Sequence, residues 1–153
     1  MQTDITLQYF SPTILKGKIT ENKCATWFLE QGYIVSIPEV PCQYDLLVDI
    51  QNKILKIQIK TSHLVNDKSG IEFKVSSITN NTQGFTRKLY TKNGVDYFMT
   101  TYNDNFYLVP FSECGVKSKK LRFMPPLNGQ RKNICFAENY LAEKILMKEV
   151  GIE

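Results

Sequence analysis

The sequence predicts an α/β fold in which a mixed central β-sheet is flanked by helices. Two observations predict this architecture: a helical pattern at each end of the chain and a series of strand-like runs between them. The 153 residues, 42% hydrophobic and 22% charged, have the length and composition of one folded domain spanning residues 1–153. We therefore expect a single domain with its own apolar core.

The first predicted helix covers residues 16–31 and is followed by Gly32, a residue typical of the position just after a helix. Spacings of three, four and seven residues place four side chains on one face of this helix, namely Glu21, Cys24, Ala25 and Phe28. Three of them suit a buried stripe. The fourth is a carboxylate, which therefore lies next to an apolar surface.

The predicted strands come next, beginning with residues 33–37, which end at Pro38. Two β-rich runs, residues 44–51 and 54–62, are then expected to form a hairpin. Further strands are predicted for residues 71–76, 96–101 and 106–110, the last two joined through Asn103-Asp104-Asn105, and a closing helix for residues 136–150.

The second hairpin strand alternates between apolar side chains and the polar side chains of Lys56, Gln58 and Lys60. A two-residue Asn52-Lys53 turn would pair Gln51 with Ile54 and set Asp45 opposite Lys60. Asp45, Gln58 and Lys60 would then share one face. A three-residue turn without a bulge would send Asp45 to the other face, so the convergence depends on the register.

These residue types suit a site for a hard divalent cation such as Mg²⁺, which prefers oxygen ligands. The Asp45 carboxylate, the Gln58 amide oxygen and the Ile59 carbonyl could supply them, with Lys60 beside the metal and Glu21 able to join the cluster. That arrangement fits hydrolysis of a phosphodiester. Spacing alone favours a plainer alternative, in which the polar side chains of this strand form a solvated outer face.

The chain has a net charge of +4. Two segments without acidic residues carry a large share of its lysines and arginines. One spans residues 73–95, with a polar loop expected at 77–93, and the other spans 114–137, with a basic segment at 115–132. Both would suit a phosphate backbone, and both could equally be solvated loops. The candidate DNA contacts are Arg87, Lys88, Lys119, Lys120, Arg122 and, at the end of the hairpin strand, Ser62.

Other features argue against a zinc protein, a secreted protein and a membrane protein. The four cysteines are scattered, which argues against a paired zinc site. Residues 1–10 lack a secretory pattern and no apolar run is long enough for a membrane span, so a cytoplasmic protein is expected. His63 follows the hairpin strand and reads as a surface residue, while Trp27 suits the core or a subunit interface.

Residues 17–62 resemble the PD-(D/E)XK nuclease superfamily, whose site combines a helix Glu, an Asp at a strand end and an acid-x-Lys on the next strand. Glu21 stands in "GKITENKCATWFLEQGY", Asp45 in "QYDLLVDI", and Gln58 with Lys60 in "LKIQIKTS". The resemblance continues through "GIEFKVSS", "YTKNGVDYFMT" and "NFYLVPF", which look like the branch containing group I intron homing endonucleases. Tyr44 stands where the family has Pro, and Gln58 where it has an acid.

The resemblance implies a restriction-endonuclease-like core and Mg²⁺-dependent, sequence-specific cleavage of double-stranded DNA, with Mn²⁺ as a possible substitute for Mg²⁺. It implies catalytic roles for Glu21, Asp45, Gln58 and Lys60. Cutting both strands favours a homo-oligomer, a tetramer more than a dimer. Two rival functions stay open: a Holliday junction resolvase with the same catalytic core, and a DNA-binding protein that has lost cleavage through Gln58.

Overall fold

The computed structural model of the chain describes residues 11–51, 53–81 and 83–151, with the side chains of residues 78–81 and 84–88 also outside the description. Helix α2 (Pro12–Glu30) comes first. It starts four residues earlier than the sequence predicts, with Pro12 in the first turn, where the lack of an N–H costs nothing. Gln31 caps its carboxyl end, and Gly32 follows with a φ of 87°, the left-handed conformation that glycine adopts easily.

A central sheet of five strands is arranged in the order β1-β2-β3-β8-β9. Its strands are β1 (Ile34–Ser36), β2 (Leu46–Ile50), β3 (Lys53–Ile59), β8 (Tyr97–Tyr102) and β9 (Asn105–Pro110). Only β3 and β8 run parallel, and the other neighbours are antiparallel, so the sheet is mixed. The predicted α/β class with a mixed central sheet is confirmed.

The register of the β2–β3 hairpin differs from the predicted one. Ile50 pairs with Lys53, and Leu46 pairs with Ile57, which shifts the alignment of the strands by two residues. The predicted pairing of Gln51 with Ile54 is therefore wrong, since Gln51 has a φ of 55° in the turn and Ile54 pairs with Asp49. Asn52, predicted to form the turn, lies outside the described residues. An even shift keeps each side chain on its face, so the alternation survives.

The hydrophobic core is split between the two faces of the central sheet. On one face, residues of α2 and of helix α3 (Ala142–Glu149) pack against the alternate strand residues Leu55, Ile57 and Met99. On the other face, Phe98 and Val109 pack against residues of a smaller sheet. That second sheet has the order β10-β5-β4, with β4 (His63–Leu64), β5 (Gly70–Lys74) and β10 (Ser118–Arg122).

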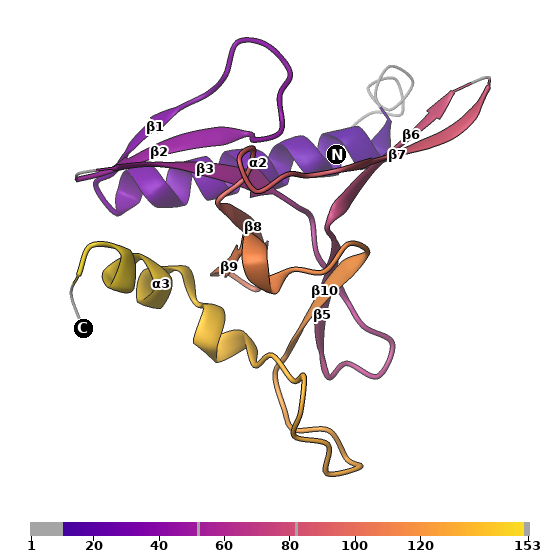
Figure 1. Ribbon diagram of the computed structural model, residues 1–153. Coiled ribbons are helices and arrows are strands. Elements are labelled where there is room, and N and C mark those ends of the chain that lie inside the picture. Colours follow the sequence, from indigo (N-terminus) through magenta and orange to yellow (C-terminus); the bar gives the residue numbers. More distant parts are fainter. Residues whose placement is uncertain (1–10, 52, 82, 152–153) are drawn as a thin grey trace, which may run out of the picture.

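The predicted polar loop at 77–93 contains an antiparallel hairpin, which corrects the sequence-based interpretation. Strands β6 (Ser76–Asn81) and β7 (Gly84–Leu89) pair with each other in a separate two-stranded sheet. Figure 1 shows this hairpin, called the arm below, projecting from the body of the molecule. Polar strands of this kind lack the alternation of apolar residues from which a strand is normally predicted.

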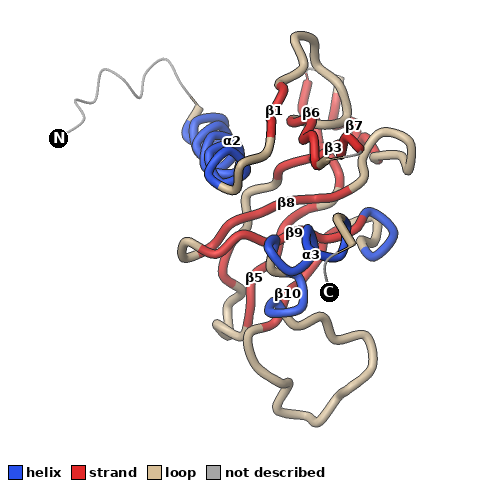
Figure 2. The backbone as a smooth tube through the Cα atoms, turned by 90° about the vertical axis from the view of Figure 1, so that its left-hand side faces the viewer, coloured by secondary structure: helices blue, strands red, loops and turns tan. Residues whose placement is uncertain are grey.

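The predicted basic segment at 115–132 is also not a loop throughout, because β10 (Ser118–Arg122) lies within it and pairs with β5. Leu121 of β10 is fully buried. The loop that follows β10 extends at the end of the molecule opposite the arm, as Figures 1 and 2 show. The two acid-free segments thus point to different ends of the protomer.

The remaining elements complete the fold. A short 3₁₀ helix η1 (Phe111–Glu113) follows β9, and the predicted closing helix is divided into η2 (Ala137–Tyr140) and α3. Leu141, with an extended backbone between the two, bridges to Tyr107 of β9. The β8–β9 turn is made by Asn103 and Asp104, both with positive φ, whereas Asn105, predicted to belong to the connection, is the first residue of β9 and pairs with Tyr102. Among the described residues, no helix combines the length and apolar character needed to cross a membrane.

Candidate active site

Asp45 is tied to strand β3 by both its main chain and its side chain. Its backbone N–H donates to the carbonyl of Ile57 at 2.8 Å, and its Oδ2 accepts a hydrogen bond from the amide of Ile59, also at 2.8 Å. Asp45 directly precedes β2, so these bonds hold the start of β2 against the end of β3. The carboxylate is thereby fixed beside the residues Gln58 to Lys60.

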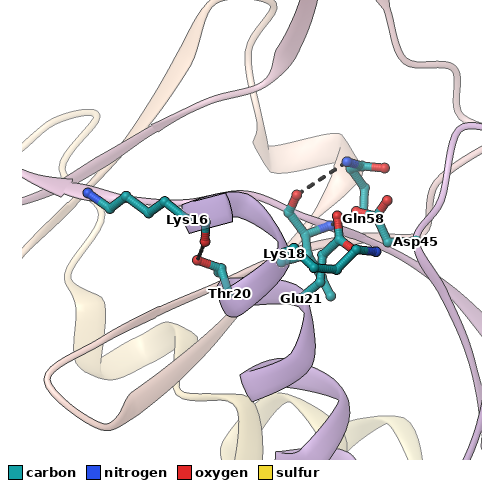
Figure 3. Close-up of polar contacts among 7 residues, drawn as sticks. Lys16, Lys18, Thr20, Glu21, Asp45 and Gln58 are labelled. Carbon is teal, nitrogen blue, oxygen red and sulfur yellow. Dashed lines mark hydrogen bonds and ion pairs between the residues drawn. The ribbon is translucent and has the colours of Figure 1, made fainter. Parts of the chain in front are cut away.

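Gln58 is buried, with only 8% of its surface exposed, which argues against the solvated-face alternative for this strand. Its Nε2 donates to the carbonyl oxygen of Ile59 at 3.2 Å. Figure 3 shows the Gln58 and Asp45 side chains close together. The amide therefore lies inside the site, next to two of the oxygens that the sequence analysis selected as metal ligands.

Lys60 follows β3 and extends the parallel pairing, since its backbone N–H donates to the carbonyl of Met99 at 2.9 Å. Its ammonium donates to the hydroxyl of Tyr90 at 2.8 Å and lies 4.7 Å from the centre of the Tyr90 ring. Burial lowers the pKa of Lys60, and the negative charge of Asp45 opposes that shift. The lysine is thus partly desolvated and electrostatically coupled to Asp45.

Glu21 reaches the same neighbourhood from helix α2 and is paired with Lys18 at 2.6 Å, one helical turn earlier. Figure 3 shows both side chains beside Asp45 and Gln58. The pKa of Asp45 is raised, chiefly by burial and also by the charge of Glu21. The Ile59 amide, Lys60 and Lys18 lower it in part. Two carboxylates and two ammonium groups therefore interact around one end of the sheet.

Helix α2 is held to the end of β3 by a contact between hydroxyl groups. Thr20 Oγ1 lies 3.0 Å from Thr61 Oγ1 and also donates to the carbonyl of Lys16 at 3.0 Å. One turn further along, the buried thiol of Cys24 has its pKa raised to about 12 by burial and by the charges of Asp45 and Glu21. Cys24 is therefore a neutral core residue next to the carboxylates, as its place on the predicted stripe indicates.

The donor groups at this end of the sheet fit a hard divalent cation. They are the Asp45 carboxylate, the Ile59 carbonyl and the Gln58 amide, which would present its oxygen after a half-turn about its last side-chain bond. Within the described residues, no three His, Cys, Asp or Glu side chains are grouped as a metal cage. The predicted ligand set thus depends on one amide and one backbone carbonyl.

The candidate DNA contacts are placed differently from one another. Arg87 and Lys88 belong to β7 of the arm, where they pair with Ile78 and Ser77. Lys120 is half-buried in β10, and Arg122 donates from its Nε to the carbonyl of Met124 at 3.0 Å. These four positions stay compatible with the sequence-based prediction.

Lys119 and Ser62 are engaged within the fold. Lys119 is 9% exposed, and its ammonium donates to the carbonyl of Glu113 at 2.6 Å and contacts the thiol of Cys135 at 3.1 Å. The hydroxyl of buried Ser62 donates to the carbonyl of Thr101 at 3.1 Å. Their placement does not favour contact with a phosphate, so neither is kept among the proposed contacts.

Several polar residues around the site escaped sequence reasoning. Tyr90 lies in the polar stretch that was interpreted as a loop, and no spacing in the sequence links it to Lys60. The Lys18–Glu21 pair could have been found from its i, i+3 spacing on a helix. A groove of about 520 Å³ beside Thr20 and Thr61 is also lined by Lys16, Lys23 and His63, which come from α2 and the segment after β3.

Comparison with known proteins identifies the family to which the chain belongs. A family model described as PD-(D/E)XK endonuclease matches residues 12–143, which is most of the chain and includes Glu21, Asp45, Gln58 and Lys60. The chain belongs to the PD-(D/E)XK endonuclease family. It is thus a nuclease, and its partner is DNA. Nucleases of this family typically use divalent metal ions, in agreement with the oxygen donors at the end of β3.

The fold of this PD-(D/E)XK chain is also found in a solved structure of a bacterial homing endonuclease, I-Ssp6803I. The two chains are 24% identical, with a TM-score of 0.71 over 92% of this chain and 97% of the other. The likeness confirms the restriction-endonuclease-like architecture. A search of curated proteins gave no match.

The raised pKa of Asp45 leads to a prediction about stability in metal-free buffer. Because the folded state favours the neutral carboxyl, ionised Asp45 destabilises the folded protein above the pKa of the folded state. Asp45→Asn should therefore increase the free energy of unfolding at neutral pH. This gain should disappear below the unfolded-state pKa of about 3.9, where Asp45 is neutral in both states. Urea denaturation across this pH range measures it.

Asp49→Asn serves as the control for that experiment, because Asp49 lies on β2 near Asp45 and pairs with Ile54 rather than with residues of the site. A gain in stability of the same size in this variant would show that the effect of Asp45→Asn does not arise from its place in the site. A stability gain for Asp45→Asn that stays constant down to acidic pH would contradict the electrostatic explanation.

Proposed function

We propose that the chain is a metal-dependent, sequence-specific endonuclease for double-stranded DNA. The observation that carries this proposal is the convergence of Asp45, Gln58 and Lys60 at the end of β3, with the Asp45 carboxylate hydrogen-bonded to Ile59. The finer proposal, a homing endonuclease encoded by a group I intron, rests on the sequence resemblance. The likeness in fold to I-Ssp6803I supports it.

The proposed metal is Mg²⁺, with Mn²⁺ as a substitute, held by Asp45, Gln58 and the Ile59 carbonyl, and Glu21 is the further candidate ligand. When bound, the cation would lower the pKa of a water molecule and neutralise charge on the phosphate. The chain's own residues would do the rest. Asp45 is already immobilised by the Ile59 amide, and Lys60 interacts electrostatically with the Asp45 carboxylate. Neither group needs a large rearrangement before the reaction.

In the proposed reaction, water attacks the phosphorus and the bond to the 3′ oxygen breaks, which leaves a 5′-phosphate and a 3′-hydroxyl. The Lys60 ammonium would donate to the water or to a phosphate oxygen as negative charge develops. Glu21, now paired with Lys18, would orient water or hold the ammonium groups in place. Each protomer has one such cluster, so cutting both strands favours a homo-oligomer, with a tetramer preferred and a dimer as the alternative.

Gln58 favours one second candidate function, that of a DNA-binding protein without cleavage. A neutral amide replaces the family's acid, which removes one negative charge from the proposed metal site. The amide is nonetheless buried and directed at the Ile59 carbonyl, inside the cluster rather than away from it. That position supports retention of a working site, and cleavage assays separate the two functions.

One prediction of the proposed function concerns the chemical groups. Asp45→Ala and Lys60→Ala should each slow cleavage by about 10²-fold or more, because each removes a charge placed at the reacting phosphate or its metal. DNA affinity should change little. Single-turnover cleavage of a library of long random duplexes, with and without Mg²⁺, measures the first effect, and binding in Ca²⁺ measures the second.

The same assay, with a four-way junction added as substrate, decides between the candidate functions. Cleavage of linear duplex by the unmodified protein supports the proposal, and preferential cleavage of the junction would identify a Holliday junction resolvase. Tight binding with no cleavage in any metal would identify the binding protein. Near-normal rates for either alanine variant would remove that residue from the site.

A second prediction concerns Gln58 as a metal ligand. Gln58→Ala should raise the Mg²⁺ concentration needed for half-maximal cleavage, because it removes an oxygen donor. Gln58→Glu has nearly the same shape and restores a charge, so it should lower that concentration or leave it similar. Its rate need not rise, since the new charge lies near Asp45 and Glu21.

Metal titration of the three proteins decides the role of Gln58, with thermal melting as a check that the alanine variant is folded. Identical Mg²⁺ dependence in all three would show that Gln58 is not a ligand. Cleavage that occurs only with Glu would show that the natural protein is a nuclease that has lost its activity.

A third prediction concerns the arm. If Arg87 and Lys88 contact phosphates, replacing both with Ala should lower the slope of log affinity against log salt by about two units, roughly one per contact. Lys148→Ala is the matched control, because Lys148 is exposed on α3. Its slope should stay unchanged. Equal slopes for all proteins would indicate that the arm is exposed to solvent and does not contact DNA. The same measurement tests Lys120 and Arg122.

A further inference from the structure

Tyr90 makes a contact with Lys60 that the proposed reaction does not explain. Its hydroxyl accepts a hydrogen bond from the Lys60 ammonium at 2.8 Å, and its ring lies 4.7 Å from the same nitrogen. The residue follows β7 directly and is partly buried against the second core cluster. Edge-to-face packing on Phe98, with ring centres 5.4 Å apart, fixes the orientation of its ring.

The chain that follows Tyr90 is also anchored close to the site. The next residue, Thr91, donates from both its backbone N–H and its hydroxyl to Gln43 Oε1, at 2.7 Å and 3.1 Å. Gln43 lies two residues before Asp45. Ser77, from β6, is a further hydrogen-bonding neighbour of the Tyr90 hydroxyl. The base of the arm is therefore fastened to both halves of the catalytic cluster.

A lysine side chain needs such a support if its ammonium is to be preorganised. Its four rotatable bonds carry a large conformational entropy, and an ammonium imposes little directional preference of its own. Tyr90 supplies the Lys60 side chain with both an oxygen acceptor and an aromatic face. Asp45 attracts the same charge but is hydrogen-bonded to Ile59.

We propose that Tyr90 is a positioning residue, whose hydroxyl and ring hold the Lys60 ammonium beside Asp45 and link its orientation to the base of the β6–β7 arm. The inference rests on the proposed endonuclease function. Tyr90 acts through Lys60 and touches neither the phosphate nor the metal. A DNA duplex that displaces the arm would accordingly move the support of the catalytic lysine.

The test compares Tyr90→Phe with the unmodified protein in two measurements. The single-turnover rate at saturating DNA and Mg²⁺ should fall about tenfold, the scale of one hydrogen bond to a charged group. The dissociation constant for DNA in Ca²⁺ should stay unchanged. The side-chain ¹⁵N resonance of Lys60, assigned with Lys60→Arg, should shift in the free protein because the ammonium loses its acceptor.

Tyr140→Phe is the matched control. The hydroxyl of Tyr140, in η2, donates to Glu113 at 2.8 Å, so this change also removes a tyrosine hydrogen bond, but one to a residue other than Lys60. It should leave both the rate and the Lys60 resonance unchanged, whatever it does to stability. An equal loss of rate in both variants would mean that Tyr90 is merely structural, and would overturn the proposal.

The two readouts separate failure of this inference from failure of the proposed function. Normal cleavage by Tyr90→Phe, faster cleavage, or an unmoved Lys60 resonance would overturn the role of Tyr90 and leave the endonuclease intact. Absence of cleavage by the unmodified protein on every DNA would overturn the proposed function, and the role of Tyr90 in it.

Discussion

The hydrogen bond from the Ile59 amide to the Asp45 carboxylate is the contact on which the geometry of the site depends. It joins the entry of β2 to the exit of β3 in a place where a buried carboxylate is costly and needs a partner. With that bond in place, Gln58, the Ile59 carbonyl and Lys60 are arranged around Asp45 by the strand itself. Everything else near the site, including the base of the arm, is fastened to this framework.

The parallel pairing of β3 with β8 explains why the cluster lies at this end of the sheet. Lys60 continues that pairing through the Met99 carbonyl, while β2 begins only at Leu46. Polar side chains can collect at such a place because the backbone groups are already paired, so the energetic cost is limited to the side chains. The helix then adds Glu21 and Lys18 from the other side, held by the Thr20–Thr61 contact.

Sequence reasoning succeeded where a periodic pattern was coupled to chemistry. The alternation of β3 put Gln58 and Lys60 on one face, and this survived a register shift of two residues because an even shift preserves the face. The fold class and the helix with Glu21 were also predictable. The family resemblance supplied what spacing could not, namely the expectation that Asp45 and Lys60 act in one site.

The errors came from segments in which tertiary contacts override local pattern. The arm has few apolar residues, and β10 is rich in lysine, so neither has the composition of a strand. Lys119 shows why charge alone is a poor guide to exposure, since only 9% of its surface is exposed. Its ammonium is satisfied by the Glu113 carbonyl in the interior, an arrangement that requires residues 113 and 119 to fold back on each other. Tyr90 could not be found because its partner is distant in sequence.

The separate pairing of β6 and β7 has a consequence for how this protein can change over generations. In the described residues these two strands pair with one another and with no other sheet, so the backbone pairing of the arm is separate from that of the central sheet. Changes in the outer part of this pair need not alter the pairing of the central sheet, whereas changes at Tyr90 remove its contact with Lys60. If the arm contacts DNA as proposed, its outer part is the segment in which target preference could change while the site stays constant, and it is the natural segment to randomise in directed evolution.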